Sequence, residues 1–438
     1  MLNNKKSKEL QEKAVKIIPG MTQLLSKRPD RYSRGVWPTY FKEAKGVEVV
    51  DLDDNHYLDF SIGGIGATVL GYADPDVNKA VIDVINKGSA TTLNPPEEVE
   101  LAEKLIELHP WADMARFSRG GGEAMSIAVR IARVATGKDK IVFCGYHGWC
   151  DWYLAANLGK KEALDDQWIA GLNPNGVPKG LTGTAIPFHY NDIKDFEKAI
   201  NEAGDDLAAI VMEPTRNFDP TQEFIDAVNN MSKEKEVPLI IDEVSAGFRI
   251  CNGGAHLKIG FKPDMAVFSK ALGNGFPVAA IIGKDWVMHY AQDAFITSTN
   301  WTERVGNAAA LAMINKFVKN DVSKHLVHIA DMVWNGWEEL GKKHGLDIHV
   351  GGFKPMVHFS FSENHFVNIA YFTQEMLKKG FLASGGFYAM YAHTEEQVEK
   401  YLKAVDEVFG QLAKLIKEGK VEENLEGQPA QAGFGRIN

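Results

Sequence analysis

The chain has 438 residues, of which 45% are apolar and 24% are charged, so it is long enough to bury at least one large core. Its formal net charge of -10 at pH 7 gives no broad attraction to nucleic acid or to anionic lipid. The charged first 20 residues lack the apolar core of a signal peptide, and no later stretch holds the roughly 20 apolar residues of a membrane span. We therefore expect a cytoplasmic protein with neither nucleic acid nor a membrane as its partner.

Residues 1–74 are expected to form an N-terminal arm and part of a small domain. The arm begins with an amphipathic helix, which is followed by a loop containing proline, glycine and arginine. A hairpin comes next, in which residues 47–50 and 57–60 flank a turn at residues 53–55.

Residues 75–320 alternate helical patterns with short apolar runs. Helices are predicted at residues 76–87 and 97–108. The apolar runs, which indicate strands buried on both faces, are residues 141–144, 208–212, 238–241, 265–268 and 278–282. This alternation predicts a large α/β domain in which helices flank a mainly parallel sheet.

Residues 321–438 have a different pattern, which predicts a smaller α+β domain. Its predicted elements are a long helix at 322–344, a strand at 356–361 and helices at 365–379 and 394–418. The tail from residue 422 onward is polar and rich in glycine, so we expect it to be loosely held.

The three cysteines, Cys144, Cys150 and Cys251, form no CxxC pair. Neither a disulfide framework nor a metal site is therefore predicted, and buried or idle thiols are expected.

Polar residues directly follow several of the apolar strands, where ligands bind in open parallel sheets. One such site is the run Gly120, Gly121, Gly122 between a short strand at 115–118 and a helix. Backbone N–H groups at a helix N-terminus suit a phosphate, although a glycine run by itself is as often only a tight turn.

Asp242 and Lys270 each end a predicted strand. Asp242 could hydrogen-bond a protonated heterocycle nitrogen, or it and Glu243 could be solvated or cap the next turn. Lys270 precedes a turn-rich segment, 271–277, and an amine held there with a lowered pKa could form an imine. Taken alone, Lys270 is better explained as a solvated surface lysine, as most lysines are.

The combination of these sites predicts a cofactor. A phosphate cradle, an acid for a pyridinium nitrogen and an amine for an aldehyde are the attachments that pyridoxal 5'-phosphate (PLP) requires. Tyr146, which follows the strand at 141–144, could stack on the cofactor ring, although ordinary packing would also explain it.

At this point the sequence resembles the fold-type I PLP-dependent transferases, in particular the class III aminotransferases and their glutamate-1-semialdehyde 2,1-aminomutase branch. The most specific motifs are Asp242-Glu-Val with Gly247-Phe-Arg249, and Lys270 with Gly273-Asn-Gly-Phe-Pro277. Further matching segments, which extend over nearly the whole chain, are residues 49–60, 70–75, 116–133, 146–148, 213–214 and 392–396.

The resemblance implies a role for each matching residue. Lys270 would hold PLP as a Schiff base and move protons, Asp242 would pair with the ring nitrogen, and Tyr146 and Val244 would lie on opposite ring faces. The backbone of Gly121 and Gly122 would hold the phosphate, and Glu213 would lie near the ring hydroxyl or the substrate entrance. The resemblance also implies a homodimer in which Thr302 of one subunit, or Thr299, reaches the phosphate in the other.

Two segments depart from the family pattern. Arg119-Gly-Gly-Gly-Glu123 stands where the family usually has Asn-Ser-Gly-Thr-Glu, which removes hydroxyl donors from the cradle and introduces an arginine that could add charge there. Residues 382–391 differ from the longer acidic segment of the aminomutases, so we expect a changed substrate pocket.

The resulting functional prediction is an aminotransferase that moves an amino group from an amino donor to a carbonyl acceptor, an aldehyde or ketone of a polar small molecule, sugar-like or phosphorylated. Arg34, Arg216 and Asn217 are candidates to orient such a substrate. The alternatives are an intramolecular 2,1-aminomutase and, from another class, a non-catalytic ligand-binding relative. The intact Lys270 and Asp242 argue against the last.

Overall fold

The computed structural model describes residues 3–167, 169–215 and 217–435 and divides the chain into two compact units. One unit spans residues 75–323, and the other combines residues 1–74 with residues 324–438. Within the described residues, no helix is both long and apolar enough to cross a membrane.

The 75–323 unit is built on a seven-stranded sheet with the order β4-β10-β9-β8-β7-β5-β6. Its strands are β4 (Met114–Ser118), β5 (Lys140–Cys144), β6 (Ala185–Pro187), β7 (Leu207–Met212), β8 (Leu239–Asp242), β9 (Met265–Phe268) and β10 (Ala279–Gly283). Five strands run parallel to one another: β9, β8, β7, β5 and β6. The strand β10 runs antiparallel to both β9 and β4. The predicted strands and the mainly parallel sheet are confirmed.

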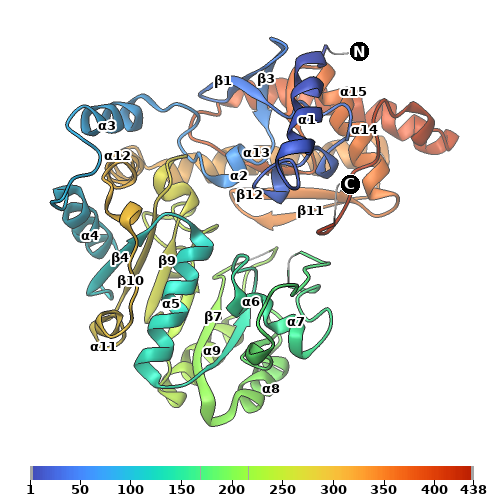
Figure 1. Ribbon diagram of the computed structural model, residues 1–438. Helices are drawn as coiled ribbons and strands as arrows, with labels where there is room; N and C mark the ends of the chain where they lie inside the picture. Colours follow the sequence, from blue (N-terminus) through green and yellow to red (C-terminus); the bar gives the residue numbers. More distant parts are fainter. Residues whose placement is uncertain (1–2, 168, 216, 436–438) are drawn as a thin grey trace. The chain divides into compact units, whose positions relative to one another are not determined.

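Both faces of this sheet are covered, which explains why its strands are continuously apolar. Residues such as Ile141 and Val211 pack with α5 (Gly121–Thr136) on one face. Their neighbours along the strands, such as Val142 and Ile210, pack with α8 (Ile193–Ala203) and α9 (Gln222–Lys235) on the other. In Figure 1, α5 lies along the sheet beside β7 and β9.

The remaining helices of this unit connect the strands or lie at the ends of the sheet. They are α3 (Pro75–Ile85), α4 (Pro96–Leu108), α6 (Asp151–Leu154), α7 (Ala156–Gly159), α10 (His256–Ile259), α11 (Asp285–Met288) and α12 (Val305–Lys319). The helices predicted at 76–87 and 97–108 correspond to α3 and α4.

The second unit contains two small sheets, ordered β1-β2-β3-β13 and β11-β12-β14. Its strands are β1 (Phe41–Lys45), β2 (Glu48–Asp51), β3 (His56–Phe60), β11 (Ile348–Phe353), β12 (Met356–Phe361), β13 (Phe381–Ala383) and β14 (Gly386–Tyr388). Its helices are α1 (Lys5–Ile17), the short turn α2 (Gly63–Gly66), α13 (Val322–His344), of which the first two residues fall in the other unit, α14 (His365–Lys378) and α15 (Glu395–Glu418). The predicted hairpin is the antiparallel pair β2–β3, and β13 joins β3 in parallel, so the N-terminal arm and the C-terminal segment share one sheet.

The expectation of a loosely held tail is wrong for the described residues up to 435. Gln428 N donates to Arg34 O at 2.9 Å, and Gln431 N donates to Asp30 O at 2.8 Å. Arg31 Nη1 donates back to Gln431 O at 2.7 Å. Because these are mostly backbone contacts, composition alone gave no sign of them.

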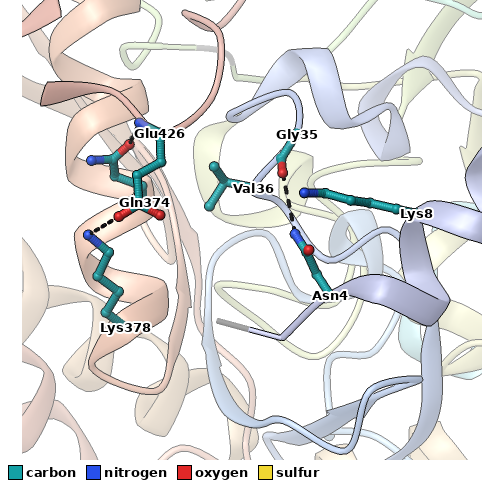
Figure 2. Close-up of a pocket in the computed structure, with 7 residues that line it drawn as sticks. All are labelled: Asn4, Lys8, Gly35, Val36, Gln374, Lys378 and Glu426. Carbon is teal, nitrogen blue, oxygen red and sulfur yellow. Dashed lines mark hydrogen bonds and ion pairs between the residues drawn. The ribbon is translucent and has the colours of Figure 1, made fainter. Parts of the chain in front are cut away.

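A small polar cavity of about 40 Å³ lies where the tail meets α14 and the N-terminal arm (Figure 2). On one wall, Lys378 Nζ contacts Glu426 Oε1 at 2.8 Å, and on the other Asn4 Nδ2 donates to Gly35 O at 3.3 Å. Ligand pockets usually have at least about 300 Å³, so we do not place the functional site here.

Candidate active site

The C-terminal ends of six of the seven strands of the large sheet, all except β10, lie at one edge. Because β10 is antiparallel to both β4 and β9, β4 points in the same direction as β9, β8, β7 and β5. The residues predicted to carry chemistry directly follow these strands, so the topology gathers them at this edge.

Lys270 lies two residues beyond β9, in a left-handed backbone conformation with φ of 43° that residues other than glycine rarely adopt. Its Nζ donates to Ser245 Oγ at 2.6 Å. Burial lowers the pKa of the Lys270 amine, whereas the carboxylates of Glu213 and Asp242 act in the opposite direction. The lysine is thus a partly buried amine with a lowered pKa beside two acids, and not a surface group.

Asp242 ends β8 and is only 4% exposed. Its Oδ1 accepts a hydrogen bond from Val244 N at 3.0 Å, and its Oδ2 lies 2.8 Å from His147 Nδ1. These two contacts fix the plane of the carboxylate and compensate the cost of burying it.

His147 is a site residue for which the sequence reasoning assigned no role. It is 1% exposed, and its Nε2 lies 3.1 Å from Cys144 O while its Nδ1 faces Asp242. Both ring nitrogens therefore face acceptors, and only the doubly protonated ring makes both contacts as hydrogen bonds. Its position directly after Tyr146, close to the end of a buried strand, was the one feature of the sequence that could have identified it as a site residue.

Glu243 has a different task from its neighbour Asp242, which explains why two buried acids are adjacent. Its Oε2 accepts from Ala255 N at 2.9 Å, and its Oε1 accepts from His256 N at 2.9 Å and lies 2.7 Å from His256 Nδ1. Glu243 thereby holds the start of α10, and the expectation that both acids could be solvated is wrong.

Tyr146 is held next to these groups. Its backbone N donates to Glu213 Oε2 at 3.2 Å, and its ring packs edge-on against Tyr153 with 5.8 Å between centroids. Burial raises the pKa of the Tyr146 hydroxyl, and the charges of Asp242 and Glu213 add to the effect. The structure thus brings Lys270, Asp242, Glu213 and Tyr146 into one electrostatic group.

The glycine turn at the start of α5 lies against the same group. A Cβ on Gly121 would come within 2.8 Å of Val244 Cγ1, so only glycine fits there. The first intrahelical bond runs from Ala124 N to Gly120 O, and the N–H groups of Gly121 and Gly122 precede it in the first turn of the helix. An amine, an acid, an aromatic ring and a helix N-terminus with close glycines are the donor set that PLP needs, so these residues fit the cofactor.

Arg119 turns away from this cradle. Its guanidinium donates to Asn300 O at 2.9 Å and to Trp301 O at 3.0 Å, and it forms an ion pair with Glu303 at 3.0 Å. The suggestion that Arg119 adds charge to the cradle is therefore not supported by its contacts. The arginine instead ties the glycine turn to the 3-10 turn Thr299–Thr302.

Among the described residues of the 75–323 unit, the other predicted residues show no contact with this group. Thr302 and Thr299 are exposed, and Thr302 Oγ1 donates to Thr299 O at 2.9 Å. Asn217 is exposed, Arg216 lies outside the described residues, and Arg34 belongs to the other unit, where its backbone pairs with Gln428.

Curated relatives match most of the chain. It is 32% identical to the 2'-deamino-2'-hydroxyneamine transaminase of Streptomyces kanamyceticus, over 88% of this chain and 93% of the relative. It is 30% identical to a 3-aminobutyryl-CoA aminotransferase of Cloacimonas acidaminovorans, over 94% of this chain and 98% of the relative. It is also 31% identical to a glutamate-1-semialdehyde 2,1-aminomutase of Methanocaldococcus jannaschii, over 92% and 98%.

Solved structures share the fold. The FumI protein of Sphingopyxis sp. MTA144, in its PLP internal aldimine form, has a TM-score of 0.86 at 24% identity and covers 97% of this chain and 99% of its own. An omega-transaminase of Sphaerobacter thermophilus has a TM-score of 0.81 at 25% identity and covers 93% and 98%. The family model for class III aminotransferases matches residues 31–409. The chain therefore belongs to the class III aminotransferases, which are PLP-dependent enzymes of the fold-type I architecture, as the sequence resemblance indicated.

Proposed function

We propose that this protein is a transaminase that uses PLP on Lys270 to move an amino group from an amino donor to an aldehyde or ketone of a polar, hydroxyl-rich or phosphorylated small molecule. The observation that carries the proposal is the Lys270 amine, whose pKa burial lowers and which lies beside Asp242 and Glu213. A lowered pKa increases the share of the amine in its neutral form, which both imine chemistry and proton transfer require.

Each residue of the group has a task in this proposal. Lys270 Nζ would take a proton from the amine-bearing carbon of the donor and would deliver a proton to the former carbonyl carbon of the acceptor. Asp242, whose carboxylate is fixed by His147 and Val244 N, keeps the ring nitrogen of the cofactor protonated. Tyr146 and Val244 hold the two faces of the ring, and the N–H groups of Gly121 and Gly122 bind the phosphate.

PLP, when bound, supplies an aldehyde that condenses with amines and an electron-poor ring that takes up the electron pair left at the substrate carbon. The protein determines where protons go and what reaches the reacting carbon. Glu213, which binds Tyr146 N, would lie near the ring hydroxyl or at the substrate entrance.

The proposed active form is a homodimer. Several large apolar side chains of the 75–323 unit are exposed, among them Leu93 at 80%, Trp149 at 73% and Phe295 at 89%. Trp149 packs beside Gly122, and Phe295 is in the segment that leads to Thr299–Thr302. Exposed apolar groups of this size are typical of an interface, and a second copy would bring Thr302, or Thr299, to the phosphate in its partner.

The names of two relatives support the proposed substrate class. The relatives include a 2'-deamino-2'-hydroxyneamine transaminase and a 3-aminobutyryl-CoA aminotransferase, whose names both refer to polar molecules. Arg34, Arg216 and Asn217 remain the proposed residues for orienting such a substrate.

A second candidate is an intramolecular 2,1-aminomutase, which the identity of 31% to a glutamate-1-semialdehyde aminomutase favours. The same residues serve both reactions, because an aminomutase retains the first product and returns the amine to a neighbouring carbon. A non-catalytic role as a ligand binder is disfavoured by the intact Lys270, Asp242 and Tyr146.

A panel assay separates these functions. Purified protein supplied with PLP is incubated with ¹⁵N-labelled glutamate or alanine and with aldehydes, keto sugars or glutamate 1-semialdehyde. Transfer of ¹⁵N to an added carbonyl compound supports the transaminase. Turnover of the semialdehyde without a second substrate identifies the mutase, and PLP binding without any turnover identifies the ligand binder.

A further inference from the structure

A polar excursion of residues 160–184 separates α7 from β6, and its described residues, which omit 168, contain a single short 3-10 turn, Lys179–Leu181. Most of its described side chains are exposed or half-buried. Gln167 is an exception, since it is 5% exposed. A buried amide on a solvated excursion needs partners for both of its ends, and these partners indicate its task.

The two ends of the Gln167 amide bind the backbone after β5 and after β6. Its Oε1 accepts a hydrogen bond from Gly145 N at 2.8 Å, and its Nε2 donates to Phe188 O at 3.2 Å. The same side chain therefore fixes the residue that precedes Tyr146 and connects it to the neighbouring strand.

Gly145 is held from its other side as well. Its carbonyl accepts from Tyr153 OH at 3.1 Å, and its φ of 119° is open to glycine but strained for other residues. A glycine can adopt many backbone conformations, so the hydrogen bonds of this peptide select the one that directs the next two residues. Those residues are Tyr146, the proposed stacking ring, and His147, the partner of Asp242.

We propose that Gln167 is a positioning residue for the cofactor site, which acts through Gly145 on the orientation of Tyr146 and His147. It does not touch the reacting atoms. The excursion would thus supply a part of the active site that lies outside the shared family motifs. The inference rests on the proposed PLP site and extends it to a residue of the excursion.

Two variants of Gln167 test the hydrogen bonds themselves. Gln167→Met keeps the length of the side chain but removes both bonds. Gln167→Glu keeps the acceptor toward Gly145 N, and only its protonated form also donates to Phe188 O. The glutamate variant should therefore approach the wild type as the pH is lowered, and the methionine variant should not.

Asn157 supplies a matched control. Its Nδ2 donates to Leu172 O at 2.6 Å, and its Oδ1 accepts from Leu164 N at 3.0 Å. It therefore holds the same excursion through an amide with two partners, but no contact joins it to Gly145. Asn157→Leu loosens the excursion without removing the bond under test.

Two quantities are measured. The visible circular dichroism per bound PLP reports the orientation of the ring, and equilibrium dialysis gives the Kd for PLP. Both are measured from pH 6 to 8.5, with the wild type as the reference at each pH. For Gln167→Met we expect the dichroism to fall by about half and the Kd to rise about 3- to 10-fold, as for one or two hydrogen bonds. Asn157→Leu should change neither by more than about 1.5-fold.

The outcomes separate this inference from the proposed function. If the wild type binds no PLP, the proposed function fails. If the wild type binds PLP and Gln167→Met keeps its dichroism and Kd, the inference alone is wrong. Equal changes in Gln167→Met and Asn157→Leu would also overturn it, because the fold of the excursion and not the Gly145 contact would then be responsible. Lack of pH rescue in Gln167→Glu counts against it in the same way.

Discussion

At the scale of single residues, the sequence identified groups whose place follows from the strand pattern and missed groups whose place follows from packing. Lys270 and Asp242 directly follow apolar runs, and the topology brings these strand ends together. Ser245, which binds Lys270 Nζ, and Gln167, which binds Gly145 N, carry no such signal. Their partners are 25 and 22 residues away, and only the folded chain brings them together.

His147 provides a test at this scale. Replacing it by leucine leaves one oxygen of the buried Asp242 without its partner, so the carboxylate is less firmly oriented and the cost of its burial is less well compensated. We expect His147→Leu to lower kcat about 10-fold or more and to weaken PLP binding. Steady-state kinetics and dialysis measure both effects.

The control is His256→Leu, because His256 contacts the adjacent acid Glu243 at 2.7 Å, a geometry close to the 2.8 Å contact of His147 with Asp242. It should lower the melting temperature while kcat of the folded protein stays near that of the wild type. Equal losses of kcat in both variants would show that general destabilisation, and not the support of Asp242, explains the effect.

At the scale of elements, segments with a clear local pattern were predicted closely, and segments that are placed by pairing with distant parts of the chain were not. The helix at 322–344 and the strand at 356–361 have the predicted bounds. The strand β13 has only three residues and gains its place by pairing with β3, more than 300 residues earlier in the chain, and the tail is held by backbone bonds. Pairings of this kind depend on which segments meet after folding, which local periodicity does not encode.

Arg119 gives the prediction for this scale. It joins the start of α5 to residues 300–303 through hydrogen bonds that carry a full charge on the donor. Arg119→Met should raise the amide hydrogen exchange of residues 299–305 about 10-fold or more, because such bonds contribute roughly 1.5–3 kcal/mol.

Arg133→Met, which removes a half-buried arginine near the end of the same helix, should leave that segment unchanged. If amide exchange in residues 299–305 is the same in Arg119→Met and in the wild type, Arg119 does not stabilise that segment against the start of α5.

At the scale of the whole molecule, the fold class was predictable because the strands of a parallel sheet that is covered on both faces are continuously apolar. Residues 208–212 and 265–268 show this pattern. The division of the second unit between the two ends of the chain was harder to derive, since it depends on the pairing of β13 with β3.

Both units contain a buried histidine that must stay neutral, which predicts an acid-sensitive fold. Burial lowers the pKa of His109 and of His393 from 6.5 to about 4. His109 Nε2 accepts from Gly254 N, and His393 Nδ1 accepts from Met390 N, so protonation of either ring breaks a hydrogen bond.

The pKa of each of these two histidines is lower in the folded protein than in the unfolded one. The stabilisation that the neutral ring provides is therefore present above about pH 6.5 and is lost as the pH falls toward 4. Each histidine should lower the free energy of unfolding by about 2 kcal/mol between pH 7.5 and 5. Urea unfolding at the two pH values measures the loss, and His109→Gln should remove part of it. Equal stability of the wild type at both pH values would contradict the prediction.

The central claim is that Lys270 carries PLP, and reduction of the holoprotein with borohydride tests it most directly. The wild type, supplied with PLP, should show a visible absorbance band that borohydride removes, and peptide mass spectrometry should then find the pyridoxyl group on Lys270. Lys270→Ala should show neither the band nor the modified peptide. A wild type that takes up no PLP, or that carries the pyridoxyl group on another lysine, would contradict the account.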